Sequence, residues 1–158
     1  MDFSNIITVD RIACGIEGVS KKRTLELLSQ LICSGHPNLH QNEVFDSLIA
    51  REKLGSTALG KGLAIPHGRL KSSDQTIAAF VQLSNGIDFD SPDSQPVDLL
   101  CALLVPPECS EEHLEVLATL SEMFSMRSLR EELRNSNDTN KIYTLLVSNA
   151  NEISKNRK

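Results

Sequence analysis

Two short apolar runs constrain the fold of this chain more than any other feature. They are TIAAFVQL at 76–83 and VDLLCALLV at 97–105. Both are hydrophobic at successive positions, which is the pattern of a strand buried on both faces. Both are also far shorter than the roughly 20 residues of a membrane-spanning helix. Because helical patterns precede and follow them, the sequence predicts an α/β fold with helices on both faces of a sheet.

Amphipathic helices are predicted on either side of the two strands. Their ranges are 20–34, 42–54, 110–126, 127–135 and 138–150. Ser20, Ser110 and Asp138 stand at N-cap positions. In the second helix Glu52 falls at the same three- and four-residue spacing as the apolar residues. An extended segment at 7–16, a short strand near 63–65 and a frayed tail at 151–158 complete the predicted elements.

Length and charge limit the classes of function. The 158 residues, 40% of them hydrophobic, suffice for one domain that spans the chain, with a core at about 7–150. A formal net charge of −5 provides no basic field for nucleic acid or an anionic membrane, so any anion must be bound locally. The N-terminus has no charged start followed by an apolar stretch. We therefore expect a cytoplasmic protein with no membrane insertion.

Four widely spaced cysteines favour reduced thiols over a disulfide framework. They are Cys14, Cys33, Cys101 and Cys109. The stretch CSGHPNLH sets Cys33, His36 and His40 at a spacing that could bind zinc, but a fourth local ligand is missing, and beyond them only Cys109 and His113 come near such a spacing. The prediction is a loop between two helices, with no metal and no cofactor.

Glycines interrupt the segment GSTALGKGLAIPHGRL at 55–70, which indicates a constrained loop rather than a helix. It is not a nucleotide-binding P-loop, because Gly62 follows Gly60-Lys61 where a hydroxyl residue would hold magnesium. Within it, Pro66 makes the preceding residue extended and places His67 at a strand end. Gly68 could then turn with a positive φ. Such a backbone holds the imidazole in one orientation, although a solvated turn histidine is the alternative.

A histidine can act as a base, a metal ligand or a nucleophile. The sequence offers no metal partners for His67 and no GxSxG nucleophile elbow. An imidazole that attacks phosphorus needs hydrogen-bond donors and positive charge nearby. The candidates are Arg51, Ser56, Thr57, Arg69, the amides of 60–63 and, in the first turn of a helix, His113. Arg51 as a solvated helix-end cation and His113 as a surface residue are the alternatives.

Three segments resemble the nitrogen-regulatory branch of one known family. REKLGSTALGKGLAIPHGRL (51–70), AAFVQLSNGIDFDSPDSQPVDLLCALLVPPE (78–108) and SEEHLEVLATLSEMF (110–124) occur in the order found there. The chain is thus similar to the mannitol/fructose-type IIA (EIIA type 2) family of the bacterial phosphotransferase system, from about residue 7 to 147. The resemblance implies a mixed sheet of about four to five strands between helices, a three-layer α/β/α fold.

The resemblance also implies roles for individual residues. His67 would accept a phosphoryl group on Nε2, Arg51 would face the phosphate, and His113 would support it by hydrogen bonding. Ser56 and Thr57 match the GST element beside the site. The donor would be a histidine phosphocarrier protein of the NPr or HPr type, charged by an enzyme I that uses phosphoenolpyruvate.

Two functions follow from the resemblance. The favoured one is a regulatory phosphocarrier that controls target proteins, such as potassium-transport or sensor-kinase proteins, according to its phosphorylation state. The alternative is a sugar-transport EIIA component that passes the phosphoryl group to an EIIB domain. A degenerate domain that only binds partners is disfavoured, because His67, Arg51 and His113 are all present.

Overall fold

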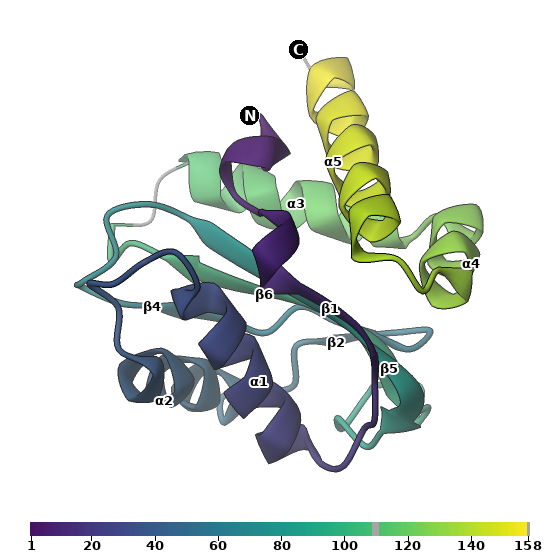
Figure 1. Ribbon diagram of the computed structural model, residues 1–158, viewed down its shortest axis with the longest axis horizontal. Coiled ribbons are helices and arrows are strands. Elements are labelled where there is room, and N and C mark those ends of the chain that lie inside the picture. Colours follow the sequence, from purple (N-terminus) through teal and green to yellow (C-terminus); the bar gives the residue numbers. More distant parts are fainter. Residues whose placement is uncertain (109–110, 158) are drawn as a thin grey trace.

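A mixed β-sheet lies between two layers of helices in the computed structural model, which describes residues 1–108 and 111–157 (Figure 1). The strands are β1 (Ile12–Ile16), β2 (Ala58–Gly60), β3 (Leu63–Ala64), β4 (His67–Arg69), β5 (Ile77–Ile87) and β6 (Val97–Val105). The helices are α1 (Lys21–Cys33), α2 (Gln41–Glu52), α3 (Glu111–Phe124), α4 (Arg127–Asn135) and α5 (Thr139–Asn156). Two short 3₁₀ turns, η1 (Phe3–Asn5) and η2 (Val9–Arg11), precede β1.

Strand β6 is the centre of the sheet. The strand order is β1-β5-β6-β3-β2, and β4 also pairs with β6 beyond the end of β3. The β5–β6 pair is antiparallel, whereas β3 and β4 both run parallel to β6 and β1 runs parallel to β5. The predicted α/β class and mixed sheet are confirmed, and β2 and β4 are two short strands beyond those expected from the sequence.

Successive apolar residues of the two long strands enter opposite cores. In β5, Ala78 and Phe80 face the core under α3, α4 and α5, whereas Ala79 and Val81 face the core under α1 and α2. Burial of both faces explains why these strands are hydrophobic at every position rather than at alternate ones. Figure 1 shows the two helical layers above and below the sheet. No helix among the described residues is long and apolar enough to cross a membrane.

Several predicted boundaries need correction. The segment 7–16 is a strand only from Ile12, because η2 turns the chain before it. Helix α5 runs to Asn156 through the segment predicted to be frayed, because Ser154 is buried and donates a hydrogen bond to Glu115 (2.9 Å). The N-caps Ser20 and Asp138 are confirmed by hydrogen bonds from backbone amides. The predicted N-cap Ser110 lies outside the described residues.

The glycine-rich stretch is a β-hairpin followed by a third short strand, rather than a loop. Lys61 and Gly62 connect β2 to β3, and both have positive φ (59° and 83°), as a two-residue I′ turn requires.

Cys14, Cys33 and Cys101 are free thiols that pack within the fold. Cys101 is fully buried, which raises the pKa of its thiol to about 12. Cys109 lies outside the described residues.

Candidate functional site

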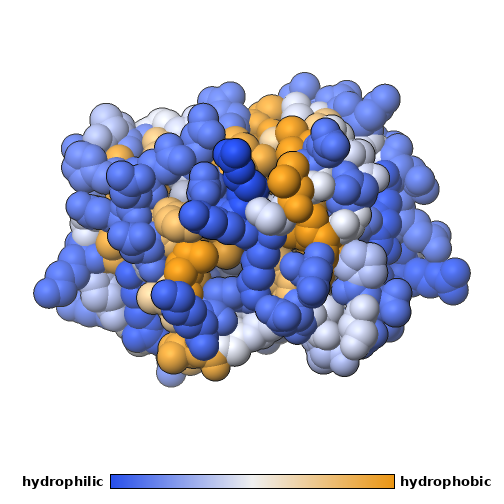
Figure 2. All heavy atoms as spheres, turned by 90° about the horizontal axis from the view of Figure 1, so that it is seen from below, coloured by the Kyte–Doolittle hydropathy of each residue, from blue (hydrophilic) through white to orange (hydrophobic). Residues whose placement is uncertain are grey.

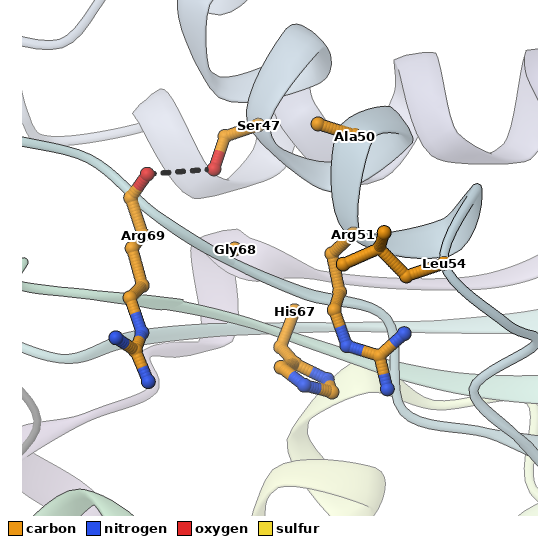
Figure 3. Close-up of a pocket in the computed structure, with 7 residues that line it drawn as sticks. All are labelled: Ser47, Ala50, Arg51, Leu54, His67, Gly68 and Arg69. Carbon is orange, nitrogen blue, oxygen red and sulfur yellow. Dashed lines mark hydrogen bonds between the residues drawn. The ribbon is translucent and has the colours of Figure 1, made fainter.

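A cavity of about 460 Å³ opens where the end of α2 meets β4. Its lining consists of Ser47, Ala50, Arg51, Leu54, His67, Gly68 and Arg69. Figure 3 shows the side chains of Arg51, His67 and Arg69 extending in the same direction, with the imidazole ring between the two guanidinium groups. The structure thus brings three of the residues predicted from the sequence, Arg51, His67 and Arg69, into one pocket.

Close contact between α2 and β4 builds this pocket. A Cβ atom at Gly68 would collide with Ser47 Oγ and lie 3.0 Å from the Ser47 carbonyl carbon. Ser47 Oγ also donates a hydrogen bond to the Arg69 carbonyl oxygen (2.8 Å). Gly68 is therefore a strand residue that allows α2 to pack closely against β4, and it does not make the positive-φ turn that the sequence predicts.

One ring nitrogen of His67 forms a hydrogen bond with the backbone. Nδ1 lies 2.9 Å from the carbonyl oxygen of Ile65. A carbonyl oxygen only accepts, so Nδ1 carries the hydrogen and the neutral ring keeps its lone pair on Nε2. The ring is half-buried. The backbone therefore selects Nε2 as the nucleophilic or hydrogen-bond-accepting atom.

Burial lowers the pKa of His67 below its ordinary value of 6.5, because the charged form loses hydration. The positive charges of Arg51 and Arg69 lower this pKa further. The hydrogen bond to Ile65 and the negative charge of Glu52 act in the opposite direction. Since the pKa falls on balance, the ring is neutral and nucleophilic at pH 7.

Arg51 is oriented by its own helix end. It lies in the last turn of α2, and its Nη1 donates a hydrogen bond to the Gly55 carbonyl oxygen (2.9 Å). Arg69 follows His67 by two residues on β4 and is exposed. Two guanidinium groups beside one imidazole favour an anion such as a phosphoryl group, which Arg can bind through two parallel hydrogen bonds.

Ser56 and Thr57 do not line the pocket. Ser56 Oγ donates to the Phe89 carbonyl oxygen (2.7 Å), and Thr57 Oγ1 donates to a carboxylate oxygen of Glu52 (2.7 Å). Their hydroxyls are thus used in holding the loop after α2. The support for the phosphate site that the resemblance implies for Ser56 and Thr57 stays a prediction.

His113 lies in the first turn of α3, as predicted, and is half-buried. It lines a different cavity, of about 270 Å³, together with residues such as Asp74, Pro106 and Glu112. The structure therefore does not place His113 among the residues that line the His67 pocket. The supporting role that the resemblance implies for it stays a prediction.

Glu52, the residue after Arg51, is a buried carboxylate that was not among the candidate site residues predicted from the sequence. Its side chain is 4% exposed, and Lys21 Nζ lies 3.1 Å from one carboxylate oxygen. The available signal was its place among the apolar residues of the predicted helix 42–54. A carboxylate on a buried helix face needs partners within the fold.

The Cys33, His36 and His40 cluster shows no metal geometry. No group of three His, Cys, Asp or Glu side chains within 1–108 and 111–157 could hold a metal ion. His36 Nε2 instead lies 3.3 Å from Arg11 Nη1, while His40 is exposed at the start of α2. The stretch is a loop between α1 and α2, as the sequence favoured.

Figure 2 views the molecule from the side that carries α1 and α2, and hydrophobic residues reach the surface there between hydrophilic ones. At the pocket itself the rim residue Leu54 is 83% exposed. A large apolar side chain beside two arginines offers a contact for a protein as well as for an anion.

Comparisons with known proteins agree with this architecture. The family model of the phosphoenolpyruvate-dependent sugar phosphotransferase system, EIIA 2, matches residues 5–149. A nitrogen regulatory protein of Pseudomonas aeruginosa is 40% identical over 145 residues, which are 92% of this chain and 94% of that protein. The crystal structure of nitrogen regulatory protein IIA-Ntr from Neisseria meningitidis has a TM-score of 0.85 at 40% identity, covering 91% of this chain and 98% of that one. A fructose-specific EIIA component of Haloferax volcanii is 31% identical over 132 residues, which are 84% of this chain and 86% of that protein.

Proposed function

Because this chain belongs to the EIIA 2 family of the phosphoenolpyruvate-dependent sugar phosphotransferase system, we propose that it is a phosphocarrier that accepts a phosphoryl group on Nε2 of His67. The observation that carries the proposal is the hydrogen bond between His67 Nδ1 and the Ile65 carbonyl oxygen. It leaves Nε2 as the one ring nitrogen with a free lone pair, in a pocket that Arg51 and Arg69 make positive.

The donor in this proposal is a phosphohistidine on a small phosphocarrier protein of the NPr or HPr type. The Nε2 lone pair attacks phosphorus in line with the donor nitrogen, the new N–P bond forms, and the electron pair of the old N–P bond stays on the donor ring. The His67 ring becomes positively charged because Nδ1 keeps its hydrogen toward Ile65, and the donor ring leaves as neutral imidazole with a hydrogen on its other nitrogen, so no proton has to move. The protein contributes position and electrostatics, which are the main requirements of phosphoryl transfer.

Arg51 and Arg69 would neutralise charge on the transferred group through charge-assisted hydrogen bonds. His113 would donate a further hydrogen bond to a phosphoryl oxygen, as the family resemblance implies. The exposed rim residue Leu54 supports a protein as the phosphoryl donor, because an apolar contact beside the pocket would help to hold a docked carrier.

We favour regulation over sugar transport as the purpose of the transfer. The nitrogen regulatory relative is 40% identical to this chain, whereas the fructose-specific relative is 31% identical. In this proposal the protein is a cytoplasmic single domain. It controls targets such as potassium-transport or sensor-kinase proteins according to its phosphorylation state. Delivery of the phosphoryl group to an EIIB domain is the second candidate.

The direct test is labelling from phosphoenolpyruvate with enzyme I and a histidine phosphocarrier. We expect one acid-labile, alkali-stable phosphate per chain, and none on His67→Ala. Persistent labelling of His67→Ala would reject His67 as the acceptor. A pull-down that compares wild type, His67→Ala and His67→Asp then identifies partners that distinguish the phosphorylation states. Rapid loss of label to an EIIB domain would favour the transport alternative.

A further inference from the structure

A buried carboxylate lies directly after Arg51 in the chain. Both oxygens of Glu52 are used: Oε1 accepts from the Thr57 amide (3.0 Å), and Oε2 accepts from the Thr57 hydroxyl (2.7 Å). Lys21 Nζ, at the start of α1, lies 3.1 Å from Oε1. A buried carboxylate is tolerated when it is paired and hydrogen-bonded, and Glu52 meets both conditions.

Thr57 continues this connection toward the pocket. Its carbonyl oxygen accepts a hydrogen bond from the Ile65 amide (3.1 Å), which extends the β2–β3 hairpin by one rung. The Ile65 carbonyl oxygen in turn receives the Nδ1–H of His67 (2.9 Å). A continuous series of hydrogen bonds therefore runs from Glu52 through Thr57 and Ile65 to the imidazole. We refer to these four residues as the Glu52 series.

The same carboxylate also fixes the end of α2. The loop after the helix is closed by a hydrogen bond from the Gly55 amide to the Glu52 carbonyl oxygen (3.2 Å), while Arg51 Nη1 donates to the Gly55 carbonyl oxygen (2.9 Å). Attachment of Thr57 to the Glu52 side chain joins both ends of the turn 52–57. Arg51 and His67 thus come from different elements but depend on one anchor.

We propose that Glu52 is a positioning residue for phosphoryl transfer: through Thr57 and Ile65 it fixes the orientation and tautomer of His67, and through the 51–57 turn it fixes Arg51. This inference rests on the proposed function, because it assigns Glu52 a role in that same site. Glu52 is not among the residues that line the pocket, so it acts without touching the phosphoryl group.

The first experiment needs no phosphoryl donor. Imidazole nitrogen NMR of the unphosphorylated chain reports whether the neutral His67 ring carries its hydrogen on Nδ1. We expect the Nδ1–H form in wild type and a mixture of tautomers in Glu52→Ala. Glu52→Gln should rescue the single tautomer, because its amide can accept from the Thr57 N–H and donate to the Thr57 hydroxyl oxygen.

The second experiment measures transfer from a phosphorylated histidine carrier. Misplaced reacting groups are costly in oriented transfers, so we expect Glu52→Ala to lower the maximal rate about tenfold with the half-saturating carrier concentration little changed. Glu52→Gln should stay within about threefold of wild type.

Two control variants separate positioning from general destabilisation. Glu43→Ala removes an exposed carboxylate from the first turn of the same helix, and Ile32→Val trims the core under α1. Neither should change the tautomer or the rate. If Glu52→Ala does not fold, Thr57→Val carries the test, since it removes the hydroxyl donor and keeps the backbone bond to Ile65. It is then expected to give the tautomer mixture and the slower rate.

The outcomes distinguish this inference from the proposed function. A single Nδ1–H tautomer in Glu52→Ala with a wild-type rate overturns the positioning role, as does an equal effect of Ile32→Val at matched loss of stability. If wild type accepts no phosphoryl group while the tautomer responds as described, the proposed function fails and the Glu52 series stands as a structural device.

Discussion

The Nδ1 atom of His67 and the carbonyl oxygen of Ile65 lie 2.9 Å apart, with Ile65 directly after β3 and His67 at the start of β4. This contact fixes which ring nitrogen is available, so we expect the phosphoryl group on Nε2 alone. Phosphorus–nitrogen couplings in NMR of the phosphorylated chain would identify the modified nitrogen. A phosphoryl group on Nδ1 would mean that the Ile65 contact is broken before transfer.

Phosphoryl acceptance should respond to pH through the His67 ring. Its pKa is lowered by burial, so the neutral form persists below the ordinary value of 6.5. We therefore expect a nearly constant rate from about pH 8 to about pH 6.5, with a decline only below it. The unfolded ring binds its proton at higher pH than the folded ring, so the protein loses stability as the pH falls from the ordinary value of 6.5 toward the lower pKa of the folded state. NMR titration of the ring, with pre-charged donor at each pH, checks both points.

Neighbouring charges should move this pKa in opposite directions. Arg51 lowers the pKa of His67 and Glu52 raises it. Replacing Arg51 by Gln should therefore raise the pKa, and Glu52→Gln should lower it. Titration of the ring signals in the two variants tests the signs of the two pKa shifts. Shifts of the same sign would show that changes in burial, not in charge, control the pKa of His67.

Arg51→Ala should slow phosphoryl transfer while the fold stays intact. Charge-assisted hydrogen bonds of this kind contribute about 1.5–3 kcal/mol, which corresponds to a rate loss of roughly tenfold to a hundredfold. Single-turnover kinetics and circular dichroism provide the measurements. Lys53→Ala is the matched control, because it removes an exposed cation two residues away. Equal losses of transfer rate in both variants would indicate a general effect of positive charge rather than a direct contact between Arg51 and the phosphoryl group.

His113→Ala tests the implied supporting histidine. Loss of one donor to the phosphoryl group should shorten the lifetime of the phosphoprotein or slow its formation by roughly tenfold. Because His113 is half-buried in the first turn of α3, the stability of the His113→Ala variant must be measured in parallel by urea unfolding. An unchanged lifetime and rate would remove His113 from the site.

Gly68→Ala should destabilise the protein and disturb the pocket. The added methyl group meets Ser47 Oγ and the helix backbone behind it, so α2 has to move away from β4. Overpacking of this kind costs about 1–3 kcal/mol in the free energy of unfolding. Urea unfolding measures the loss, and Ser47→Gly should restore part of it in the double variant. An additive double variant would show that Ser47 is not the obstacle.

Local sequence signals predicted the elements that depend on local physics. The Ser20 cap of α1, the buried strands β5 and β6 and the helical last third follow from capping and periodicity. Strand β4 escaped prediction because its three residues become a strand only by pairing with β6, far along the chain. The tail at 151–156 looked polar, yet contacts with α3 hold it in a helix.

The candidate site was predictable in part for the same reason. Pro66 and Gly68 marked His67 as unusual within its own segment, and the structure places Arg51 beside it. The Glu52 series was not predictable, because it depends on backbone groups of Thr57 and Ile65 that meet only when the hairpin forms. The separate cavity at His113 likewise depends on how α3 packs, which periodicity does not determine.

The pairing of His67 and Leu103 joins the proposed acceptor to the central strand of the fold. Opening β4 would expose β6. The backbone amides of β4 should therefore exchange with solvent about as slowly as global unfolding allows. The Arg51 guanidinium, in contrast, is held at the exposed end of α2, where Nη1 donates a hydrogen bond to the Gly55 carbonyl oxygen. An arriving partner can therefore reorient the Arg51 guanidinium without disturbing the core, while the His67 imidazole keeps its position beside it.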